Sequence, residues 1–211
     1  MRTLGIDEAG RGSVLGPMVV GAFCCDAADF PALVDAGAAD SKTLSRKRRT
    51  TRRTSLAQLG EWAVELVTPA QIDAGNINTL EEEVFARLIQ RFAPEHVIID
   101  APVHPRGIPS FQGRLEHRLA ALGCPIPRWT IEPKADANHP PVGAASIFAK
   151  TSRDAAIDAL GPEVGSGYPS DPKTRAWIRD FLSRDVPLPA CVRTRWGTID
   201  ALRQQLLFPG G

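Results

Sequence analysis

The sequence predicts an α/β domain built on a largely paired central sheet. Short apolar runs that end at Gly, Pro or Asp alternate with stretches in which apolar residues recur every three or four positions. The first pattern is typical of buried strands and the second of amphipathic helices, and their interleaving favours a sheet covered by helices. A chain of 211 residues is long enough to bury one substantial core.

The predicted elements follow in chain order. Apolar runs predict five strands, at residues 3–7, 18–25, 61–67, 96–100 and 129–132. Helical periodicity predicts helices at residues 46–59, 80–92, 111–122 and 142–160. The segment GPEVGSGYPSDP, residues 161–172, interrupts the pattern, and two more helices are predicted at residues 173–183 and 198–207. We therefore expect a main domain over residues 1–160 and a C-terminal helical segment over residues 161–211, packed as one compact unit.

The composition excludes several classes of protein. A formal net charge of +1 with 43% hydrophobic residues favours neither disorder nor a generally basic coat for nucleic acid, so any electrostatic signal must be local. The four cysteines form no CxxC pair and no disulfide framework, and the N-terminus lacks the apolar core of a signal peptide. We expect a cytoplasmic protein, and a monomer because no heptad pattern or spare apolar stripe demands a partner.

Carboxylates end two of the predicted strands. GIDEAGRG places Asp7 and Glu8 at the end of the first strand, and HVIIDAP places Asp100 at the end of another. Side chains alternate along a strand, so one carboxylate of the adjacent pair should dominate; we expect Asp7, with Glu8 reaching the site from the twisted strand end or through water. If the two strands are parallel neighbours, Asp7 and Asp100 meet beyond the strand ends.

A further carboxylate, Asp136 in KADANHPPVGAASIFAK, precedes a helix expected to begin near Pro141. Taken singly, an Asp at such a position is more often a turn residue or a helix cap. Carboxylates that converge without arginines repel one another, and oxygen-preferring cations such as Mg²⁺ or Mn²⁺ would remove that repulsion. The paired carboxylates, the Gly-Arg-Gly turn and the second acidic strand end together favour a metal site.

Several separate segments carry a resemblance to one known family. They are GIDEAGRGSVLGPMVV, DSKTLS, VIIDAP, KADA with AASIFAKTSRD, GSGYPSDPKTRAWI and VRTRWGT, which extend from residue 5 to residue 198. In this order they resemble the type 2 ribonucleases H, the ribonuclease HII family in its archaeal and eukaryotic form. Ser13 is a departure, because many relatives carry a proline after the Gly-Arg-Gly turn.

The resemblance implies a ribonuclease H-like fold, a mixed five-stranded sheet flanked by helices, with a C-terminal helical segment that closes over the substrate. It implies endonucleolytic cleavage of RNA in RNA/DNA hybrids and on the 5′ side of single ribonucleotides in duplex DNA, for removal of ribonucleotides from DNA. The catalytic, metal-binding set would be Asp7, Glu8, Asp100 and Asp136. Two Mg²⁺ or Mn²⁺ ions would act during catalysis and give 3′-hydroxyl and 5′-phosphate ends.

The resemblance also implies a set of substrate-binding residues. Gly10, Arg11 and Gly12 would recognise the 2′-hydroxyl, since glycines let the backbone approach a sugar closely. Arg11 would contact phosphate or the strand beside the scissile bond. Tyr168, the only tyrosine, is either a packing anchor for its loop or, by resemblance, packs against the sugar next to the ribonucleotide.

Basic and polar residues suggest further contacts with nucleic acid. Residues 42–53, KTLSRKRRTTRR, contain seven basic residues and no acidic ones, which fits a solvated helix face as well as a phosphate backbone. Lys42, in the DSK segment that resembles the family, is expected nearest the site. Ser146 and Lys150 share a helix face that could contact the DNA strand, although Lys150 could instead pair with acidic neighbours on its helix.

Other functions stay open at this point. The C-terminal RQQLLFPGG, residues 203–211, loosely resembles sliding-clamp-binding peptides through its QQLLF, and also fits an amphipathic helix end. Another nuclease of the same fold, such as a junction resolvase or integrase, would cleave all-DNA substrates. A non-catalytic hybrid-binding protein would have little reason to keep four repulsive carboxylates, and no GxxxxGK[ST] loop supports a phosphotransferase. The compact length favours a chain that works without partner subunits.

Overall fold

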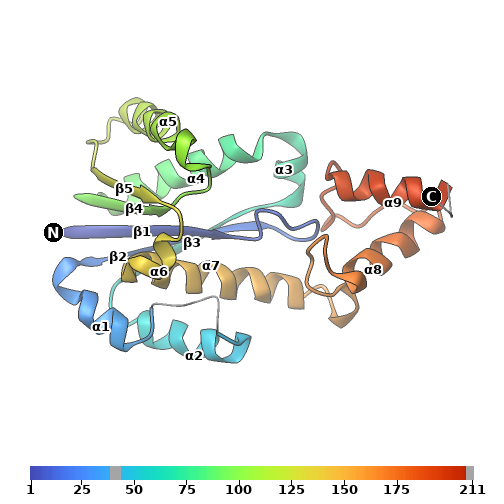
Figure 1. Cartoon of the computed structure of the whole chain (residues 1–211), viewed down its shortest axis with the longest axis horizontal. Helices are drawn as coiled ribbons and strands as arrows, with labels where there is room; N and C mark the ends of the chain where they lie inside the picture. Colours follow the sequence, from blue (N-terminus) through green and yellow to red (C-terminus); the bar gives the residue numbers. More distant parts are fainter. Residues whose placement is uncertain (39–43, 208–211) are drawn as a thin grey trace.

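A computed structural model of the chain describes residues 1–38 and 44–207. It contains a five-stranded sheet in the order β3-β2-β1-β4-β5 (Figure 1). β2 is antiparallel to β1 and β3, whereas β1, β4 and β5 are parallel. The strands are β1 (Arg2–Ala9), β2 (Met18–Asp26), β3 (Glu61–Val67), β4 (His96–Asp100) and β5 (Arg128–Glu132). This mixed sheet confirms the predicted fold class, and each predicted strand is present within three residues of its expected ends.

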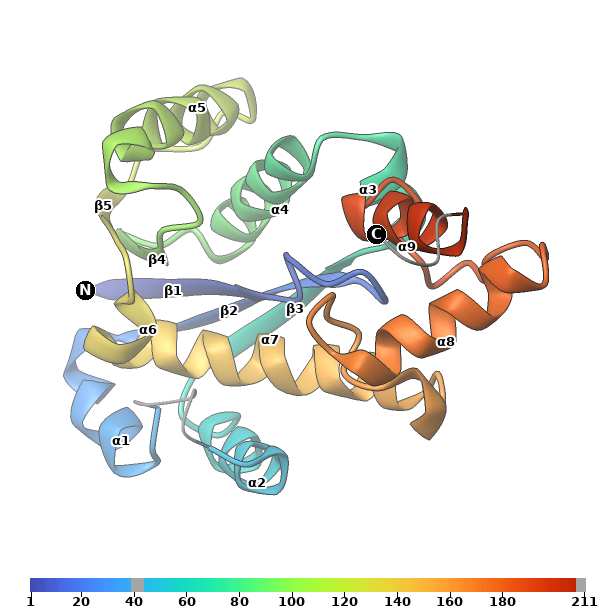
Figure 2. The ribbon, with the colours of Figure 1, turned by 45° about the vertical axis from the view of Figure 1, so that its right-hand side comes forward.

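Helices cover both faces of the sheet (Figures 1 and 2). One face carries α3 (Pro69–Ala74), α4 (Ile77–Phe92) and α5 (Ile108–Ala121). The other face carries α1 (Phe30–Asp35), α2 (Arg46–Leu56), α6 (Ala135–Asn138) and α7 (Pro140–Asp158). Short 3-10 turns occupy Ala27–Asp29, Pro105–Gly107 and Pro162–Val164. Each layer has its own apolar cluster, so strand alternation decides which layer a side chain of β1 joins.

The alternation along β1 places the acidic residues. Leu4 and Ile6 belong to the apolar cluster on the α4 side, so Glu8, which has the same parity, is directed to that side. Asp7 shares the parity of Gly5, over which α7 packs. A Cβ at Gly5 would lie 2.3 Å from the backbone carbon of Pro141, so only glycine admits the helix so close to the strand. α7 therefore lies directly against the face of β1 that carries Asp7.

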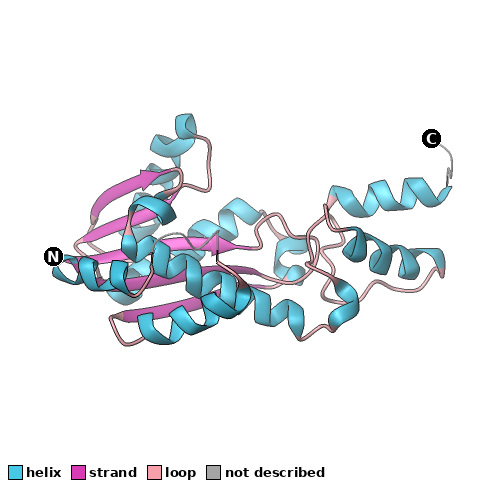
Figure 3. Cartoon of the chain, turned by 60° about the horizontal axis from the view of Figure 1, so that its bottom comes forward, coloured by secondary structure: helices cyan, strands magenta, loops and turns pink. Residues whose placement is uncertain are grey.

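The C-terminal segment lies beyond the carboxyl end of β1 (Figures 1 and 3). It contains α8 (Pro172–Ser183) and α9 (Gly197–Leu207). One apolar cluster joins Val14, Leu15 and Ile157 of the main domain to Val164, Ile178, Val192, Ile199 and Leu202 of the segment. The two parts are thus packed against each other, and the segment faces the loop that follows β1.

The sequence missed three short helices, α1, α3 and α6. They contain six, six and four residues, too few turns for a periodic pattern to be recognised. Asp136 consequently lies inside α6, a short helix that precedes the one expected to begin near Pro141. A capping box formed by Thr68 and Gln71 marks the start of α3 and was visible in the sequence.

Some predictions are not tested by the fold. No helix within residues 1–38 and 44–207 is long and apolar enough to cross a membrane. The cytoplasmic location and the monomeric state stay predictions, as does the division at residue 160.

Candidate active site

Three carboxylates meet at the carboxyl end of the central strands. β1 and β4 are parallel, and their register pairs Ile6 with Ile99, so Asp7 and Asp100 follow side by side. α6 adds Asp136. One carboxylate oxygen from each of these three residues lies within 4.8 Å of the others. We call Asp7, Asp100 and Asp136 the carboxylate cluster; its oxygens are close enough together to contact one cation.

The carboxylate cluster is acidic, with two members buried and Asp100 half-buried. Asp7 and Asp136 are only 5% and 3% exposed. Burial raises the pKa of Asp7 to about 6, the Ser146 hydroxyl and Lys150 oppose this shift, and the other two carboxylates add to it. Lys150 Nζ lies 3.7 Å from Asp136 Oδ2 and donates a hydrogen bond to Ser146 Oγ at 2.7 Å. Within the described residues, Lys150 brings one positive charge to three carboxylates, and this group of oxygen donors suits divalent cations.

Glu8 lies beside the carboxylate cluster on the other face of β1. Its Oε2 is buried and has no hydrogen-bond partner among the residues that the structure describes. Burial raises the pKa of Glu8 well above its usual range, and Asp7 and Glu81 raise it further. The structure thus brings three of the four predicted carboxylates together and leaves Glu8 as an adjacent oxygen donor.

The Gly-Arg-Gly turn, residues 10–12, directly follows β1. The Ser13 N–H donates to the Gly10 carbonyl at 3.2 Å and closes a β-turn. Gly10 has a φ of +75°, and a Cβ there would lie 2.9 Å from the Pro17 carbonyl oxygen. At Gly12, by contrast, a Cβ would meet none of the described residues within 4 Å. The turn is therefore tightly packed on the Gly10 side and open on the Gly12 side.

The Arg11 side chain is bound to α4. Its Nε lies 3.1 Å and 3.2 Å from the two carboxylate oxygens of Glu81, and its Nη2 donates to the Asn78 side chain. Glu81 is 1% exposed; burial raises its pKa to about 7, and Arg11 opposes this shift. The guanidinium of Arg11 is thus already paired, and its expected contact with phosphate stays a prediction.

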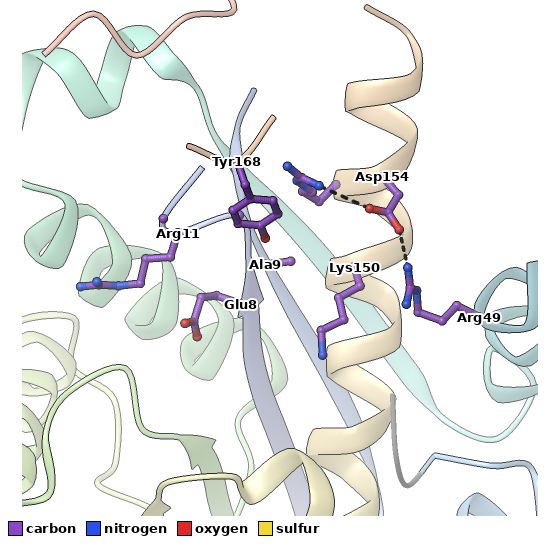
Figure 4. Close-up of a pocket in the computed structure, with 10 residues that line it drawn as sticks. Glu8, Ala9, Arg11, Arg49, Lys150, Asp154 and Tyr168 are labelled. Atoms are coloured by element: carbon purple, nitrogen blue, oxygen red, sulfur yellow. Dashed lines mark hydrogen bonds and ion pairs between the residues drawn. The ribbon is translucent and has the colours of Figure 1, made fainter. Parts of the chain in front are cut away.

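A cavity of about 390 Å³ opens between the Gly-Arg-Gly turn and α7 (Figure 4). Glu8 and Lys150 lie on either side of β1 at its floor, and Tyr168 lies above them. The cavity therefore joins residues that are distant in the sequence and borders the carboxylate cluster through Lys150. Its lining consists of Glu8, Ala9, Gly10, Arg11, Gly12, Arg49, Lys150, Arg153, Asp154 and Tyr168.

Tyr168 is held by neighbouring residues but is still partly exposed to solvent. Tyr168 is 36% exposed, and the Arg153 guanidinium lies 4.5 Å from the centroid of its ring. Arg153 also donates to Ser13 Oγ at 3.1 Å and to the Ser166 carbonyl. Ser13 in turn donates to the Gly167 carbonyl at 2.8 Å. These contacts fix the Tyr168 loop to the Gly-Arg-Gly turn while leaving one side of the ring accessible.

The predicted basic residues are only partly placed at the site. Lys42 lies outside the described residues. Arg46 and Arg49 of α2 form ion pairs with Asp158 and Asp154 of α7, so part of the positive charge in residues 42–53 stabilises the fold. Ser146 and Lys150 lie beside the carboxylate cluster. Lys150 approaches Asp136 of α6, a partner that was not considered from the sequence.

Sequence reasoning missed two residues that hold the Gly-Arg-Gly turn. Glu81 binds the Arg11 side chain, and the fully buried Arg193 binds the carbonyls of Gly10 and Arg11. Arg193 stands in the segment VRTRWGT, which carried the resemblance without an assigned role. No local pattern could pair it with residues 10 and 11, because such long-range contacts leave no periodic signal.

The family model for ribonuclease HII matches residues 4–199 of the chain. The chain belongs to the ribonuclease HII family. It is 36% identical to ribonuclease HII of Thermococcus onnurineus, across 98% of this chain and 92% of the relative. It is 39% identical to ribonuclease HII of Thermofilum pendens, across 96% of this chain and 99% of the relative. As a ribonuclease HII family member it is a ribonuclease H, a hydrolase of a metal-dependent family that acts on RNA/DNA hybrids.

Solved structures agree with this ribonuclease HII assignment. The ribonuclease H2 of Pyrococcus horikoshii superimposes with a TM-score of 0.87 at 34% identity, covering 99% of this chain and 100% of that one. The ribonuclease HII chain of the PCNA:RNase HII complex from Archaeoglobus fulgidus superimposes with a TM-score of 0.84 at 37% identity, covering 96% of this chain and 97% of that one. Bst-RNase HIII gives 0.79 at 19% identity, covering 99% of this chain and 71% of that one, which reflects the shared fold.

Proposed function

We propose that this chain cleaves the RNA of RNA/DNA hybrids, and cleaves duplex DNA on the 5′ side of a single embedded ribonucleotide, for ribonucleotide removal. The observation that supports this proposal is the position of the carboxylate cluster beside the Gly-Arg-Gly turn. Asp7 and Gly10 are three residues apart, so their α-carbons are separated by no more than about 11 Å. Cleavage and sugar recognition would therefore fall within about one nucleotide of each other.

Asp7, Glu8, Asp100 and Asp136 would hold two Mg²⁺ or Mn²⁺ ions. The donor set fits such ions, because it consists of carboxylate oxygens, three of them within 4.8 Å of one another. It also includes Oε2 of Glu8, which has no hydrogen-bond partner within residues 1–38 and 44–207. When bound, the two ions supply a water activated near neutral pH and stabilisation of the leaving 3′ oxygen, which gives 3′-hydroxyl and 5′-phosphate ends.

The residues around the carboxylate cluster keep it in position. The Ser146 hydroxyl hydrogen-bonds to Asp7, and Lys150 places a positive charge near Asp136. The N–H of Ala135 donates to Asp100 Oδ1 at 3.2 Å. Lys150 also lines the cavity, and we propose that Lys150 and Ser146 contact the DNA strand, as does Lys42.

The Gly-Arg-Gly turn would bind the ribose. The backbone N–H groups of Arg11 and Gly12 donate no hydrogen bond within residues 1–38 and 44–207, and both residues line the cavity. A 2′-hydroxyl oxygen can accept from such groups, and DNA has no oxygen at this position. The Arg11 side chain would contact the strand beside the scissile bond, and the exposed side of Tyr168 would pack on the sugar of the next nucleotide.

The test is cleavage of three labelled duplexes with Mg²⁺: one with a single ribonucleotide in DNA, one RNA/DNA hybrid and one all-DNA duplex. We expect a single nick 5′ of the ribonucleotide, cuts in the hybrid RNA, and no cleavage of DNA. Cleavage of all three would instead indicate a general nuclease of the same fold. Binding without cleavage would indicate a hybrid-binding protein.

We also propose that the C-terminal QQLLF, residues 204–208, binds a sliding clamp, and that the chain acts as a monomer. The related Archaeoglobus fulgidus protein is named in a complex with PCNA. Leu206 and Leu207 at the end of α9 are 36% and 72% exposed, so apolar side chains are available there. Deletion of residues 204–211 should abolish clamp binding measured by calorimetry; unchanged affinity would exclude this site.

A further inference from the structure

Arg193 binds the Gly-Arg-Gly turn from inside the protein. It lies in the loop between α8 and α9 and is fully buried. Its guanidinium donates to the carbonyl of Gly10 at 2.6 Å, to that of Arg11 at 2.8 Å and to that of Gly16 at 3.1 Å. Its own backbone N–H donates to the Val14 carbonyl at 2.9 Å. One residue of the C-terminal segment thus binds four carbonyls of the loop that follows β1.

This arrangement is costly for a residue that only fills space. Among the residues that the structure describes, no carboxylate forms an ion pair with Arg193, and its polar contacts are backbone carbonyls. Burial and the nearby Arg153 lower its pKa to about 10, so it is still charged at neutral pH. A buried charge without an ion-pair partner destabilises a fold, and an apolar side chain of similar volume would not carry this penalty. The cost points to a role beyond packing.

The geometry of the peptide bond connects Arg193 to the cavity. In a planar trans peptide, the C=O and the N–H of the next residue point in opposite directions. The Gly10 and Arg11 carbonyls face the buried guanidinium, so the N–H groups of Arg11 and Gly12 face away from it. Neither of these N–H groups makes a hydrogen bond within the described residues, and both Arg11 and Gly12 line the cavity. Two adjacent N–H groups with similar directions form a site for an oxygen atom.

We propose that Arg193 is a positioning residue that orients the N–H groups of Arg11 and Gly12 toward the substrate sugar. The C-terminal segment then determines ribose recognition by a turn that is 183 residues away in the sequence. This inference rests on the proposed function, in which the Gly-Arg-Gly turn binds the 2′-hydroxyl. Arg193 itself touches no substrate in this arrangement.

The test measures binding of two duplexes, one with a single ribonucleotide and one of DNA only, to protein that carries Asp100→Asn to prevent cleavage. The variant is Arg193→Lys, which keeps the charge but cannot reach three carbonyls with one fork of donors. The matched control is Asp73→Asn. Asp73 accepts from the N–H and the hydroxyl of Thr194, both at 2.7 Å, so it links α3 to the same loop without contacting the turn.

We expect the parent and Asp73→Asn to bind the ribonucleotide duplex at least about five-fold more tightly than DNA. The ratio should fall to about one in Arg193→Lys, although the affinity for DNA is kept. A general loosening of the C-terminal segment would instead lower the affinity for both duplexes in both variants. Folding of each variant is checked by its thermal midpoint.

A second variant covers the case in which Arg193→Lys does not fold. Trp196→Leu keeps the Arg193 side chain but removes the indole ring whose centroid lies 5.1 Å from the guanidinium, so the guanidinium is held less firmly against the three carbonyls. It should lower the ratio part of the way. An unchanged ratio in a folded Arg193→Lys, or in Trp196→Leu when the first does not fold, would overturn the inference, as would an equal loss in Asp73→Asn. If the parent binds both duplexes equally and the wild-type protein does not cleave the ribonucleotide duplex, the proposed function is overturned instead.

Discussion

The carboxylate cluster and the Gly-Arg-Gly turn both lie at the end of β1, but the cluster contains charges that repel one another, whereas the turn is held by attractive interactions. The cluster brings together three carboxylates, two of them buried, and Asp100 and Asp136 raise the pKa of Asp7 whereas Lys150 lowers it. The turn is fixed by hydrogen bonds from a buried guanidinium and by an ion pair between Arg11 and Glu81. The comparison teaches that substitutions in the cluster should remove activity without loss of stability, whereas most substitutions in the turn should reduce both.

The largest effect is expected at the carboxylate cluster. Asp100→Asn should lower cleavage of the single-ribonucleotide duplex by more than ~100-fold, since it removes a proposed ligand itself, and even the loss of a residue that orients a ligand typically costs 10–100-fold. Asp158→Asn is the control, because this exposed carboxylate on α7 pairs with Arg46 away from the cluster. Steady-state kinetics with Mg²⁺ checks both. Comparable activity of the two variants would contradict the assignment of the metal site.

The second effect separates the two glycines of the turn. Gly12→Ala should leave the free energy of unfolding within ~0.5 kcal/mol of wild type, because a Cβ there meets no atom within 4 Å among the described residues. It should still lower cleavage by about 100-fold, since the methyl group displaces the sugar. Gly10→Ala should cost at least ~1–2 kcal/mol, because Gly10 adopts a positive φ. Urea unfolding and cleavage assays measure both quantities, and full activity of Gly12→Ala would exclude a close approach of substrate.

The third effect tests the stability cost of the cluster. In metal-free protein, Asp7→Asn should be more stable than wild type at about pH 8. The pKa of Asp7 rises from 3.8 to about 6 on folding, so its ionisation destabilises the native state fully above pH 6 and not at all below about pH 4. The free energy of unfolding of Asp7→Asn should therefore exceed that of wild type by an amount that grows with pH, up to about 3 kcal/mol.

Urea unfolding in EDTA at several pH values measures this difference. Added Mg²⁺ should raise the thermal midpoint of wild type and leave that of Asp7→Asn nearly unchanged. A lower stability of Asp7→Asn at about pH 8 in EDTA would show that the carboxylate contributes favourably without a cation.

The smallest effect concerns the loop of Tyr168. Asp171 caps α8 through the Lys173 N–H at 2.9 Å and accepts from the Ser166 N–H at 2.6 Å, and these bonds hold its pKa at about 2. Asp171→Asn should cost about 1 kcal/mol at neutral pH, because it removes the negative charge from these hydrogen bonds and from the N-terminus of α8. The depressed pKa of Asp171 adds to the free energy of unfolding above about pH 4, and this addition is lost as the pH falls through about 2. The difference in free energy of unfolding between wild type and Asp171→Asn should therefore become smaller in acid. Urea unfolding across that range checks it.

The sequence predicted the sheet and part of the site for physical reasons. Strand ends marked by Asp7 and Asp100 are local signals, and strand alternation assigned Glu8 to the other face of β1. Asp136 was a weaker candidate from the residues alone, and the resemblance strengthened it, because α6 is a single turn without periodicity. The contacts of Arg193 and Glu81 with the turn span 183 and 70 residues, and only tertiary packing creates them.

The most direct test of the account is the location of Mn²⁺ by anomalous diffraction in crystals of the protein with its nicked single-ribonucleotide duplex. The account predicts anomalous peaks ligated by Asp7, Asp100 and Asp136, with the ribose against the N–H groups of Arg11 and Gly12. Peaks away from these carboxylates, or a ribose outside the cavity beside the Gly-Arg-Gly turn, would contradict it.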